Sequence, residues 1–299
     1  DHVLTDINWD VIFVDDNLPD GTAQILREIA QQRSDVRIMQ RVGERGLSSA
    51  CISGMLASSA PYLAVMDADL QHEETLLPQM FDRLQNSNLD IIIGTRYAKG
   101  GEVGIGLSPL RRRISLFATQ LSQLVLKGKY SDPMSGFFML RRPFLERTLD
   151  QLSGRGFKIL FDLLASSPKP INFEEIPYEM RPRLAGESKL DLMAIWDFLI
   201  LILDKFIGRF LPIRFVMFAI VGTLGAILHL FVLYLILLRL NFDFMIAQAT
   251  ATFIAMILNY SLNNILTYRD LKLRGVGFVK GLVTFCIACS IGAIVNVLL

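Results

Sequence analysis

The sequence predicts an α/β domain with a mostly parallel sheet, followed by amphipathic interfacial helices and an all-α transmembrane bundle. Three observations lead to this prediction. Strand-like apolar runs alternate with helical patterns in the first hundred residues, and long apolar segments fill most of the chain beyond residue 214. The chain is also 52% hydrophobic, with a mean hydropathy of +0.41, whereas soluble domains are about 45–50% apolar.

The alternation in the first part of the chain indicates parallel strands joined by helices. Strands are expected at residues 9–16, 36–41, 62–69 and 90–96, and helices at 21–33, 46–59 and 74–85. Sheets of this kind bind ligands at the carboxyl ends of their strands. Three expected strands end in polar residues that would line one crevice: Asp15 and Asp16, Asp67 and Asp69, and Thr95 and Arg96.

Asp67 and Asp69 end the third expected strand, in the stretch VMDADLQH. Residues two apart in an extended chain point to the same side, so these carboxylates would repel each other unless a cation lay beside them. Oxygen ligands favour a hard cation such as Mg2+ or Mn2+, which keeps open positions for phosphate groups. The pair therefore predicts a metal site for a nucleotide diphosphate, with a solvated turn and helix cap as the alternative.

Two basic clusters lie nearer the membrane segments, PLRRRIS at 109–115 and RPRLAGESKL at 181–190. Basic side chains at these places suit an anionic lipid headgroup or a pyrophosphate. The alternative for the first cluster is a solvated positive face that meets anionic lipid generally. For the second cluster, the alternative is a loop of no special role.

The apolar segments at 215–238, 244–268 and 276–299 are long enough to cross a bilayer core. Residues 190–210 place charged side chains on one side of a helix, which favours a position in the headgroup layer; an ordinary core helix is the alternative. We therefore expect three parts: an α/β domain at 1–189, amphipathic interfacial helices at 190–211 and a transmembrane domain at 212–299.

The charge pattern predicts an integral membrane protein with its α/β domain on the cytoplasmic face. Basic residues precede the first span and follow the second, whereas the loop between them has only Arg239 and Asp243, and positive residues gather on the cytoplasmic side. The first ten residues do not have the pattern of a signal peptide. The net charge of +1 gives no field that would favour nucleic acid.

Five motifs occur in order along the first part of the chain: VDD…DGT (14–22), MDADLQH (66–72), GTRY (94–97), DPMSGFF (132–138) and GESKL (186–190). With them, the chain resembles family 2 glycosyltransferases, in the group of dolichol-phosphate mannosyltransferases and polyprenyl-phosphate sugar synthases. The membrane part, with NYSLNNILTYRD at 259–270, resembles the GtrA-like family.

The resemblance implies a GT-A fold, a divalent metal (Mg2+ or Mn2+), a GDP- or UDP-hexose donor and a polyprenyl phosphate acceptor. It implies that Asp15 or Asp16 contacts the nucleoside, and that a second set binds the metal and the diphosphate: Asp67, Asp69 and Gln71. It also implies an acceptor-phosphate set: Arg96, Arg111, Ser115, Asp132, Ser135 and Arg183, with Arg181 competing for the role of Arg183. Lys189 would neutralise charge near the leaving group, and the catalytic residues would be Asp69, Arg96 and Lys189.

The expected activity is metal-dependent, inverting transfer of a hexose to dolichyl or undecaprenyl phosphate at the cytoplasmic membrane face. The hexose would be mannose from GDP-mannose or glucose from UDP-glucose. Against the family pattern the chain lacks an opening strand and has three spans instead of four, so it is expected to be a fragment.

Two other functions are compatible with parts of the sequence. One is a membrane lipid-sugar translocase or regulator with a degenerate nucleotide-binding domain. The other is a signalling receiver phosphorylated on Asp67, although a receiver needs neither GESKL nor a membrane bundle. A processive polysaccharide synthase is disfavoured because neither tryptophan lies in a QxxRW motif.

Overall fold

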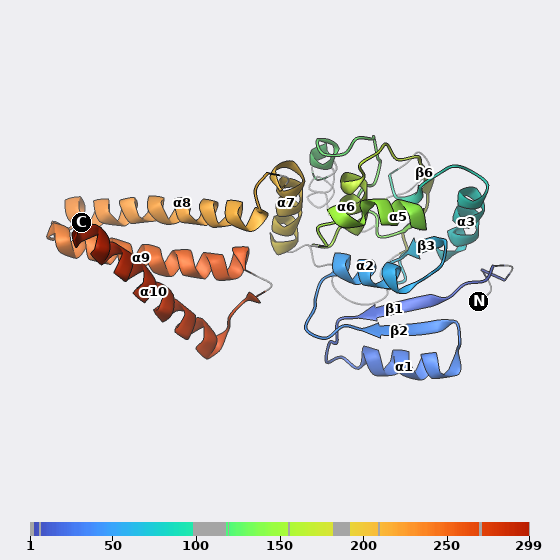
Figure 1. Cartoon of the computed structure of the whole chain (residues 1–299), viewed down its shortest axis with the longest axis horizontal. Helices are drawn as coiled ribbons and strands as arrows, with labels where there is room; N and C mark the ends of the chain where they lie inside the picture. The colour runs from blue at the N-terminus through green and yellow to red at the C-terminus, as the bar shows by residue number, and fades with distance from the viewer. Residues whose placement is uncertain are drawn as a thin grey trace. The chain divides into compact units, whose positions relative to one another are not determined.

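The computed structural model describes residues 3–5, 7–97, 118, 120–154, 156–181, 192–208, 210–268 and 271–298. Side chains are described for all of these except residues 192–195 and 292–298. The chain divides into two compact units, Asp1–Phe206 and Ile207–Leu299, and most of their helices and strands are labelled in Figure 1.

The first unit begins with the alternation of strands and helices that the sequence predicts. The elements are β1 (Val11–Asp15), α1 (Thr22–Gln32), β2 (Val36–Gln40), α2 (Leu47–Ala57), β3 (Tyr62–Val65), a 3-10 turn (Glu74–Leu76), α3 (Leu77–Gln85) and β4 (Ile91–Thr95). β3 ends earlier than expected, because its sheet partner pairs only with Tyr62 to Val65. Asp67 and Asp69 therefore lie in the loop beyond the strand and not within it.

The second half of this unit contains elements that the sequence analysis did not predict. They are β5 (Phe138–Arg141), α5 (Arg142–Thr148), a 3-10 turn (Leu149–Gln151), α6 (Ile159–Ser166) and β6 (Phe173–Pro177). β1 and β2 form a parallel pair, and the other strands form a sheet in the order β3-β5-β4-β6. β5 runs antiparallel to β3 and β4, while β6 is parallel to β4. β3, β4 and β6 thus share one direction, which confirms the mostly parallel α/β fold.

The core lies on both faces of the sheet, and β4 supplies residues to each. Ile91 and Ile93 pack in the cluster that includes residues of α2, α5 and α6, whereas Ile92 packs with Met80 and Leu84 of α3. Successive side chains of a strand point to opposite faces, so a strand covered on both faces reads as a continuous apolar run. The sequence IIIGT is such a run.

Helix α7 (Leu192–Ile207) packs against α6 within the first unit. Phe198 lies edge-on to Phe161, with ring centroids 5.8 Å apart, and Leu201 is buried in the core. Lys205 Nζ lies 2.5 Å from Asp162 Oδ1, and Asp162 is fully buried. One side of α7 therefore belongs to the core of the α/β unit, and contact of its other side with lipid stays a prediction.

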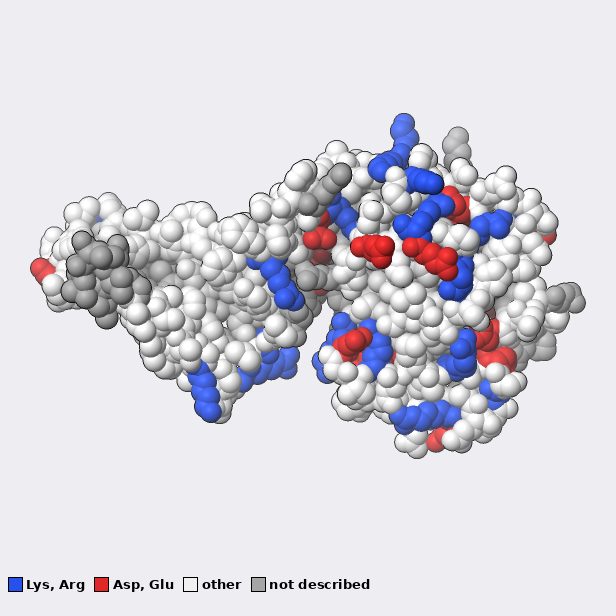
Figure 2. Space-filling view, in the orientation of Figure 1, with Lys and Arg blue, Asp and Glu red and all other residues white. Residues whose placement is uncertain are grey.

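The second unit is helical and mostly apolar. It contains α8 (Ile213–Tyr234), a π-helical turn (Leu235–Arg239), α9 (Phe244–Leu262), a second π-helical turn (Asn263–Thr267) and α10 (Gly275–Leu298). Two helical segments of the described residues are long and apolar enough to cross a membrane, Ile213–Arg239 and Phe244–Thr267. Figure 2 shows mostly uncharged atoms on the visible face of this unit, with Lys and Arg side chains near the start of α10.

Polar side chains fix the packing of these helices. The Asn259 side chain lies against Gly225 of α8, where an added Cβ would approach Asn259 Oδ1 to 2.0 Å. Asn264 accepts from Leu273 N at 2.9 Å and donates to Leu273 O at 3.1 Å, which ties the end of α9 to the segment before α10. The hydrogen bonds of Asn264 satisfy polar groups inside an apolar unit, whereas Asn259 Oδ1 is buried and has no hydrogen-bond partner in the described residues.

Candidate functional site

The first acidic pair follows β1 and is bound into the fold. Asp16 Oδ1 accepts a hydrogen bond from Arg41 Nε at 2.8 Å, and Asp16 Oδ2 accepts one from Gly46 N at 2.9 Å. Asp15 Oδ1 accepts from Asn17 N at 2.9 Å, and Asn17 has a φ of 55°. Asp16 is therefore neutralised by a neighbouring arginine, and the chain turns sharply after the pair.

Arg41 links the ends of β1 and β2 to the start of α2. Its guanidinium donates to Ser49 Oγ at 2.9 Å and to Gly46 O at 3.0 Å, in addition to Asp16. The Arg41 side chain is only 4% exposed. A buried guanidinium needs partners for its N–H groups, and here the carboxylate, a hydroxyl and a carbonyl provide them.

The second acidic pair lies in the loop after β3. The Asp67 carboxylate packs against the main chain of Gly136, where an added Cβ would lie 2.3 Å from Asp67 Oδ2. Asp69 Oδ1 accepts from Gln71 N at 3.2 Å. Between them, Leu70 has a φ of 61°, a strained conformation for a residue other than glycine. Two of the sequence motifs, MDADLQH and DPMSGFF, therefore meet at Asp67 and Gly136.

His72 connects this loop to the end of β6. Its Nδ1 lies 2.7 Å from Tyr178 Oη, and its Nε2 lies 3.7 Å from Asp67 Oδ2. The histidine is buried, and its ring also packs against Phe137. Burial raises the pKa of the Tyr178 hydroxyl, so this hydroxyl stays protonated at neutral pH. Tyr178 therefore fixes the orientation of the imidazole that faces Asp67.

Arg96 and Asp132 form a bidentate pair beyond β4. Arg96 Nε donates to Asp132 Oδ2 at 2.7 Å, and Arg96 Nη2 donates to Asp132 Oδ1 at 3.0 Å. Burial lowers the pKa of Arg96, but the hydrogen bonds and charge of Asp132 more than reverse this, and the net pKa shift is upward. Asp132 is 1% exposed whereas the Arg96 side chain is 21% exposed, so the arginine is the partner that a ligand can reach.

Ser135 and Thr95 hold the main chain around this pair. Ser135 Oγ donates to Gly94 O at 2.6 Å, and Phe137 N donates back to Ser135 Oγ at 3.2 Å. Thr95 Oγ1 lies 2.6 Å from Ser131 Oγ. Both Ser135 and Thr95 are buried, so their hydroxyl groups join the end of β4 to the DPMSGFF loop.

The structure brings several predicted site residues to the carboxyl ends of β1, β3 and β4: Asp15, Asp16, Asp67, Asp69, Gln71, Arg96, Asp132 and Ser135. Gln71 Nε2 donates to Arg181 O at 3.0 Å and Arg181 N donates to Gln71 O at 3.0 Å. The Arg181 guanidinium pairs with Glu74 at 2.8 Å. Four predicted residues lie outside the described part of the chain: Arg111, Ser115, Arg183 and Lys189.

The loop after β3 contains oxygen ligands of the kind that a divalent cation takes. They are the carboxylates of Asp67 and Asp69 and the amide oxygen of Gln71, whose amide nitrogen donates to Arg181 O. Mg2+ is usually held by one or two carboxylates, with substrate phosphates and water completing its shell. Within the described ranges, no group of three or more His, Cys, Asp or Glu side chains is placed to hold a metal ion, so such a site would depend on phosphate oxygens.

The sequence patterns predicted no role for Arg41, His72 or Tyr178. Arg41 follows a predicted strand and His72 ends the MDADLQH motif, so each carried a positional signal. Tyr178 follows β6, which was not predicted, and no local pattern marks it. The contacts of all three residues join segments far apart in the sequence, which a one-dimensional pattern does not show.

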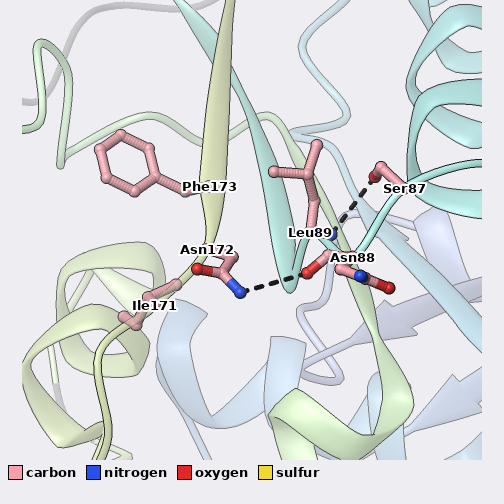
Figure 3. A pocket seen from close by; sticks show the side chains of 6 residues that line it. All are labelled: Ser87, Asn88, Leu89, Ile171, Asn172 and Phe173. Carbon is pink, nitrogen blue, oxygen red and sulfur yellow. Dashed lines mark hydrogen bonds between the residues drawn. The ribbon is translucent and has the colours of Figure 1, made fainter.

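A shallow pocket lies at the opposite end of the sheet from these residues. Its lining comes from the segments that lead into β4 and β6: Ser87, Asn88, Leu89, Ile171, Asn172 and Phe173. In Figure 3, Asn172 donates to Asn88 O, at 3.3 Å. Because ligands of such sheets bind at the carboxyl ends of the strands, this pocket is not the candidate site.

Comparison with known proteins identifies both parts of the chain. The glycosyl transferase family 2 model matches residues 2–149, and the model of the GtrA/DPMS transmembrane domain matches residues 217–299. A dolichol-phosphate mannosyltransferase of Pyrococcus furiosus is 35% identical over 99% of this chain and 82% of its own length. One of Saccharomyces cerevisiae is 36% identical over 75% of this chain and 84% of its own length.

Two solved structures are similar to this chain at low sequence identity. Glucosyl-3-phosphoglycerate synthase from Mycobacterium tuberculosis is 18% identical, with a TM-score of 0.45 over 65% of this chain and 67% of that one. Mannosyl-3-phosphoglycerate synthase from Rubrobacter xylanophilus is 14% identical, with a TM-score of 0.46 over 68% of this chain and 63% of that one.

Proposed function

The chain belongs to glycosyl transferase family 2 and has a GtrA/DPMS transmembrane domain, and on that premise we propose that this glycosyltransferase moves mannose from GDP-mannose to a polyprenyl phosphate. The observation that supports the proposal most is the arrangement around Asp67. Carboxylate oxygens for a cation lie on the loop after β3, and a ligand-accessible arginine lies beyond β4. The curated relatives named above are dolichol-phosphate mannosyltransferases.

In the proposed donor site, Asp67, Asp69 and Gln71 would hold Mg2+ or Mn2+, whose positive charge stabilises the departing nucleoside diphosphate. Asp15 or Asp16 would contact the nucleoside: Asp15 is buried and accepts from Asn17 N, whereas Asp16 is more exposed and is bound by Arg41 and Gly46. Lys189 stays the predicted cation near the leaving group.

In the proposed acceptor site, Arg96 binds the lipid phosphate. Asp132 orients the Arg96 guanidinium, and since it is a buried anion we assign it no phosphate contact. Ser135 holds the main chain through Gly94. Arg111, Ser115 and Arg183 stay predicted members of the acceptor site.

The proposed reaction needs no strong general base. A phosphate monoester has a second pKa of about 6, so its oxygen is already anionic at neutral pH. That oxygen attacks the anomeric carbon, a new carbon–oxygen bond forms, and the bond to the diphosphate oxygen breaks. Direct displacement inverts the anomeric centre, so an α-linked donor gives a β-linked lipid product. The contribution of the protein is alignment and charge stabilisation.

The proposed location is the cytoplasmic face of a membrane. The described basic residues Lys272, Arg274 and Lys280 are exposed near the start of α10, which agrees with the positive-inside pattern. Lys205 does not count toward the positive-inside pattern, because its ammonium pairs with the buried carboxylate of Asp162. The polyprenyl phosphate would reach Arg96 from the inner leaflet.

One experiment tests the proposal directly. The protein in membranes is offered GDP-mannose or UDP-glucose labelled in the sugar, and lipid is extracted into organic solvent. We expect label from GDP-mannose in the lipid, its loss on treatment with EDTA, and its return with Mg2+ or Mn2+. Lipid that stays unlabelled with both donors would contradict the proposal, and flipping of a preformed lipid-linked sugar without donor would favour a translocase.

A further inference from the structure

Arg181 is a basic residue beside the loop after β3 to which the roles above give no task. It follows β6 (Phe173–Pro177) in the sequence, and its main chain pairs with Gln71 in both directions. Gln71 Nε2 donates to Arg181 O at 3.0 Å, and Arg181 N donates to Gln71 O at 3.0 Å. One residue thus holds both the main chain and the side-chain amide of Gln71.

The guanidinium of Arg181 is bound by a carboxylate of the protein. Arg181 Nη1 donates to Glu74 Oε2 at 2.8 Å, and Arg181 Nη2 donates to Glu74 Oε1 at 3.3 Å, which is the bidentate geometry of strong arginine–carboxylate pairs. A main-chain hydrogen bond and the hydrogen bond from Arg181 lower the pKa of the Glu74 carboxyl, so it is ionised at neutral pH. Both side chains are exposed, so the pair stands in contact with solvent.

These contacts fasten the loop after β3 at two points. Gln71 lies within the loop, and Glu74 begins the 3-10 turn that follows it. The hydrogen bond from Gln71 Nε2 fixes the orientation of the Gln71 amide, and Gln71 N in turn donates to Asp69 Oδ1 at 3.2 Å. A shift of Arg181 would therefore pass through Gln71 to Asp69, which are two of the three residues proposed to hold the cation.

We propose that Arg181 is a positioning residue of the cation site: by pairing with Glu74 it holds the loop after β3 in the conformation in which Gln71 and Asp69 bind the divalent cation. The inference rests on the proposed function, which places Mg2+ or Mn2+ on this loop. Arg181 contacts no phosphate in this assignment, because its guanidinium is bound by Glu74. Outer partners of this kind orient the ligands of a metal and tune its affinity.

The test is a double-mutant cycle of Arg181→Met, Glu74→Gln and the variant with both changes, each compared with the wild type. The Kd of Mn2+ is measured by electron paramagnetic resonance with GDP present, which needs no turnover. Because the ion pair is exposed, each single change should weaken Mn2+ binding only about 2- to 5-fold. Because the two side chains act as a pair, the double variant should bind Mn2+ no more weakly than either single variant.

The direction of the change separates positioning from a plain effect of charge. Removal of a positive charge near a cation site strengthens Mn2+ binding, and removal of a negative charge weakens it, whereas loss of positioning weakens it in both single variants. An Arg181→Met protein that binds Mn2+ as tightly as the wild type, or more tightly, overturns the inference. So does a double variant whose loss is the product of the two single losses. A rise in the KM for polyprenyl phosphate that is confined to Arg181→Met would identify a phosphate contact and overturn it too.

The matched control is Arg83→Met. Arg83 of α3 pairs with Glu174 of β6, and both side chains are likewise exposed, but this pair joins α3 to β6 and not to the loop after β3. The control should keep the wild-type Kd of Mn2+. Thermal unfolding shows that each variant is folded, and Arg181→Gln takes the place of Arg181→Met in the cycle if the latter does not fold.

The two proposals fail in distinguishable ways. A wild-type protein that binds Mn2+ and transfers no sugar contradicts the proposed function, while the cycle of Mn2+ affinities still decides on Arg181. An active wild type, with Arg181→Met at the wild-type affinity for Mn2+, overturns the inference alone. A wild type that binds no Mn2+ with GDP present contradicts both.

Discussion

Two acidic pairs follow strands of the α/β unit, and the structure surrounds them differently. Asp15 and Asp16 follow β1, and Asp16 is neutralised by Arg41. Asp67 and Asp69 follow β3, and in the described residues Nε2 of the His72 imidazole lies 3.7 Å from Asp67 Oδ2. In both places a residue with positive φ turns the chain immediately afterwards. The two pairs look alike in the sequence, and the structure describes an arginine partner for the first.

The charge of an acidic pair at a strand end can be compensated in two ways. The fold can supply the cation, as Arg41 does for Asp16, and the pair then contributes to stability. Alternatively the compensating charge comes with a ligand and the pair contributes to binding, which is the role proposed for Asp67 and Asp69. Removal of a carboxylate should therefore impair transfer at the second pair, and removal of the arginine should impair folding at the first.

The largest expected effect is at the second pair. Asp69→Ala removes one proposed cation ligand, and a loss of about 10^3-fold in kcat/KM should follow, since electrostatic stabilisation of this kind contributes several kcal/mol. Thermal unfolding should stay close to that of the wild type. Transfer assays with Mn2+ titration measure kcat/KM. An Asp69→Ala protein with wild-type turnover and wild-type affinity for Mn2+ would contradict a binding role for the second acidic pair.

At the first pair, Arg41→Met should act on stability. The variant leaves Asp16 without its cation in a partly buried place, which costs about 3 kcal/mol. Urea unfolding of the protein in detergent measures the loss. Arg37→Met is the matched control, on the strand that ends just before Arg41: Arg37 pairs with Asp10, and both side chains are well exposed, so its loss should be below about 1 kcal/mol. Equal losses in the free energy of unfolding of the two variants would show that Arg41 stabilises the fold no more than an exposed arginine does.

Gly136→Ala tests whether the position of Asp67 matters. The new Cβ would lie 2.3 Å from Asp67 Oδ2, so the carboxylate must move. A displacement of about 1 Å can cost about 10^2-fold in rate. We expect a loss of this size in kcat/KM with little change in the Kd of GDP measured without metal. Unchanged kinetics would mean that the proposed cation does not depend on Asp67.

The smallest expected effect is that of Tyr178→Phe. The variant removes the hydroxyl 2.7 Å from His72 Nδ1 and keeps the aromatic packing. Outer partners of this kind change metal affinity by about 10- to 100-fold, and we expect the low end because His72 is itself one step removed. The affinity of the variant for Mn2+ is measured by electron paramagnetic resonance. If Tyr178→Phe binds Mn2+ as tightly as the wild type, His72 and Tyr178 have only a packing role.

The sequence predicted the elements whose pattern is local. β1 to β4 and their helices follow from apolar periodicity, and the polar strand ends follow from position. β5 was missed because its short apolar run follows a loop and pairs antiparallel between β3 and β4, an arrangement that the alternating pattern does not contain. The different surroundings of the two acidic pairs could not be predicted, because Arg41 comes close to Asp16, and Gly136 to Asp67, only in the folded chain.

The carboxylate of Asp162 sets where the α/β unit can be separated from its membrane helices. It binds Ser153 and Gly154 ahead of α6, and it also binds Lys205 near the end of α7. A shortened protein that stopped at residue 190 would leave this buried carboxylate without its lysine, and about 3–5 kcal/mol of stability would be lost. A water-soluble version of this glycosyltransferase should therefore keep α7 through Phe206.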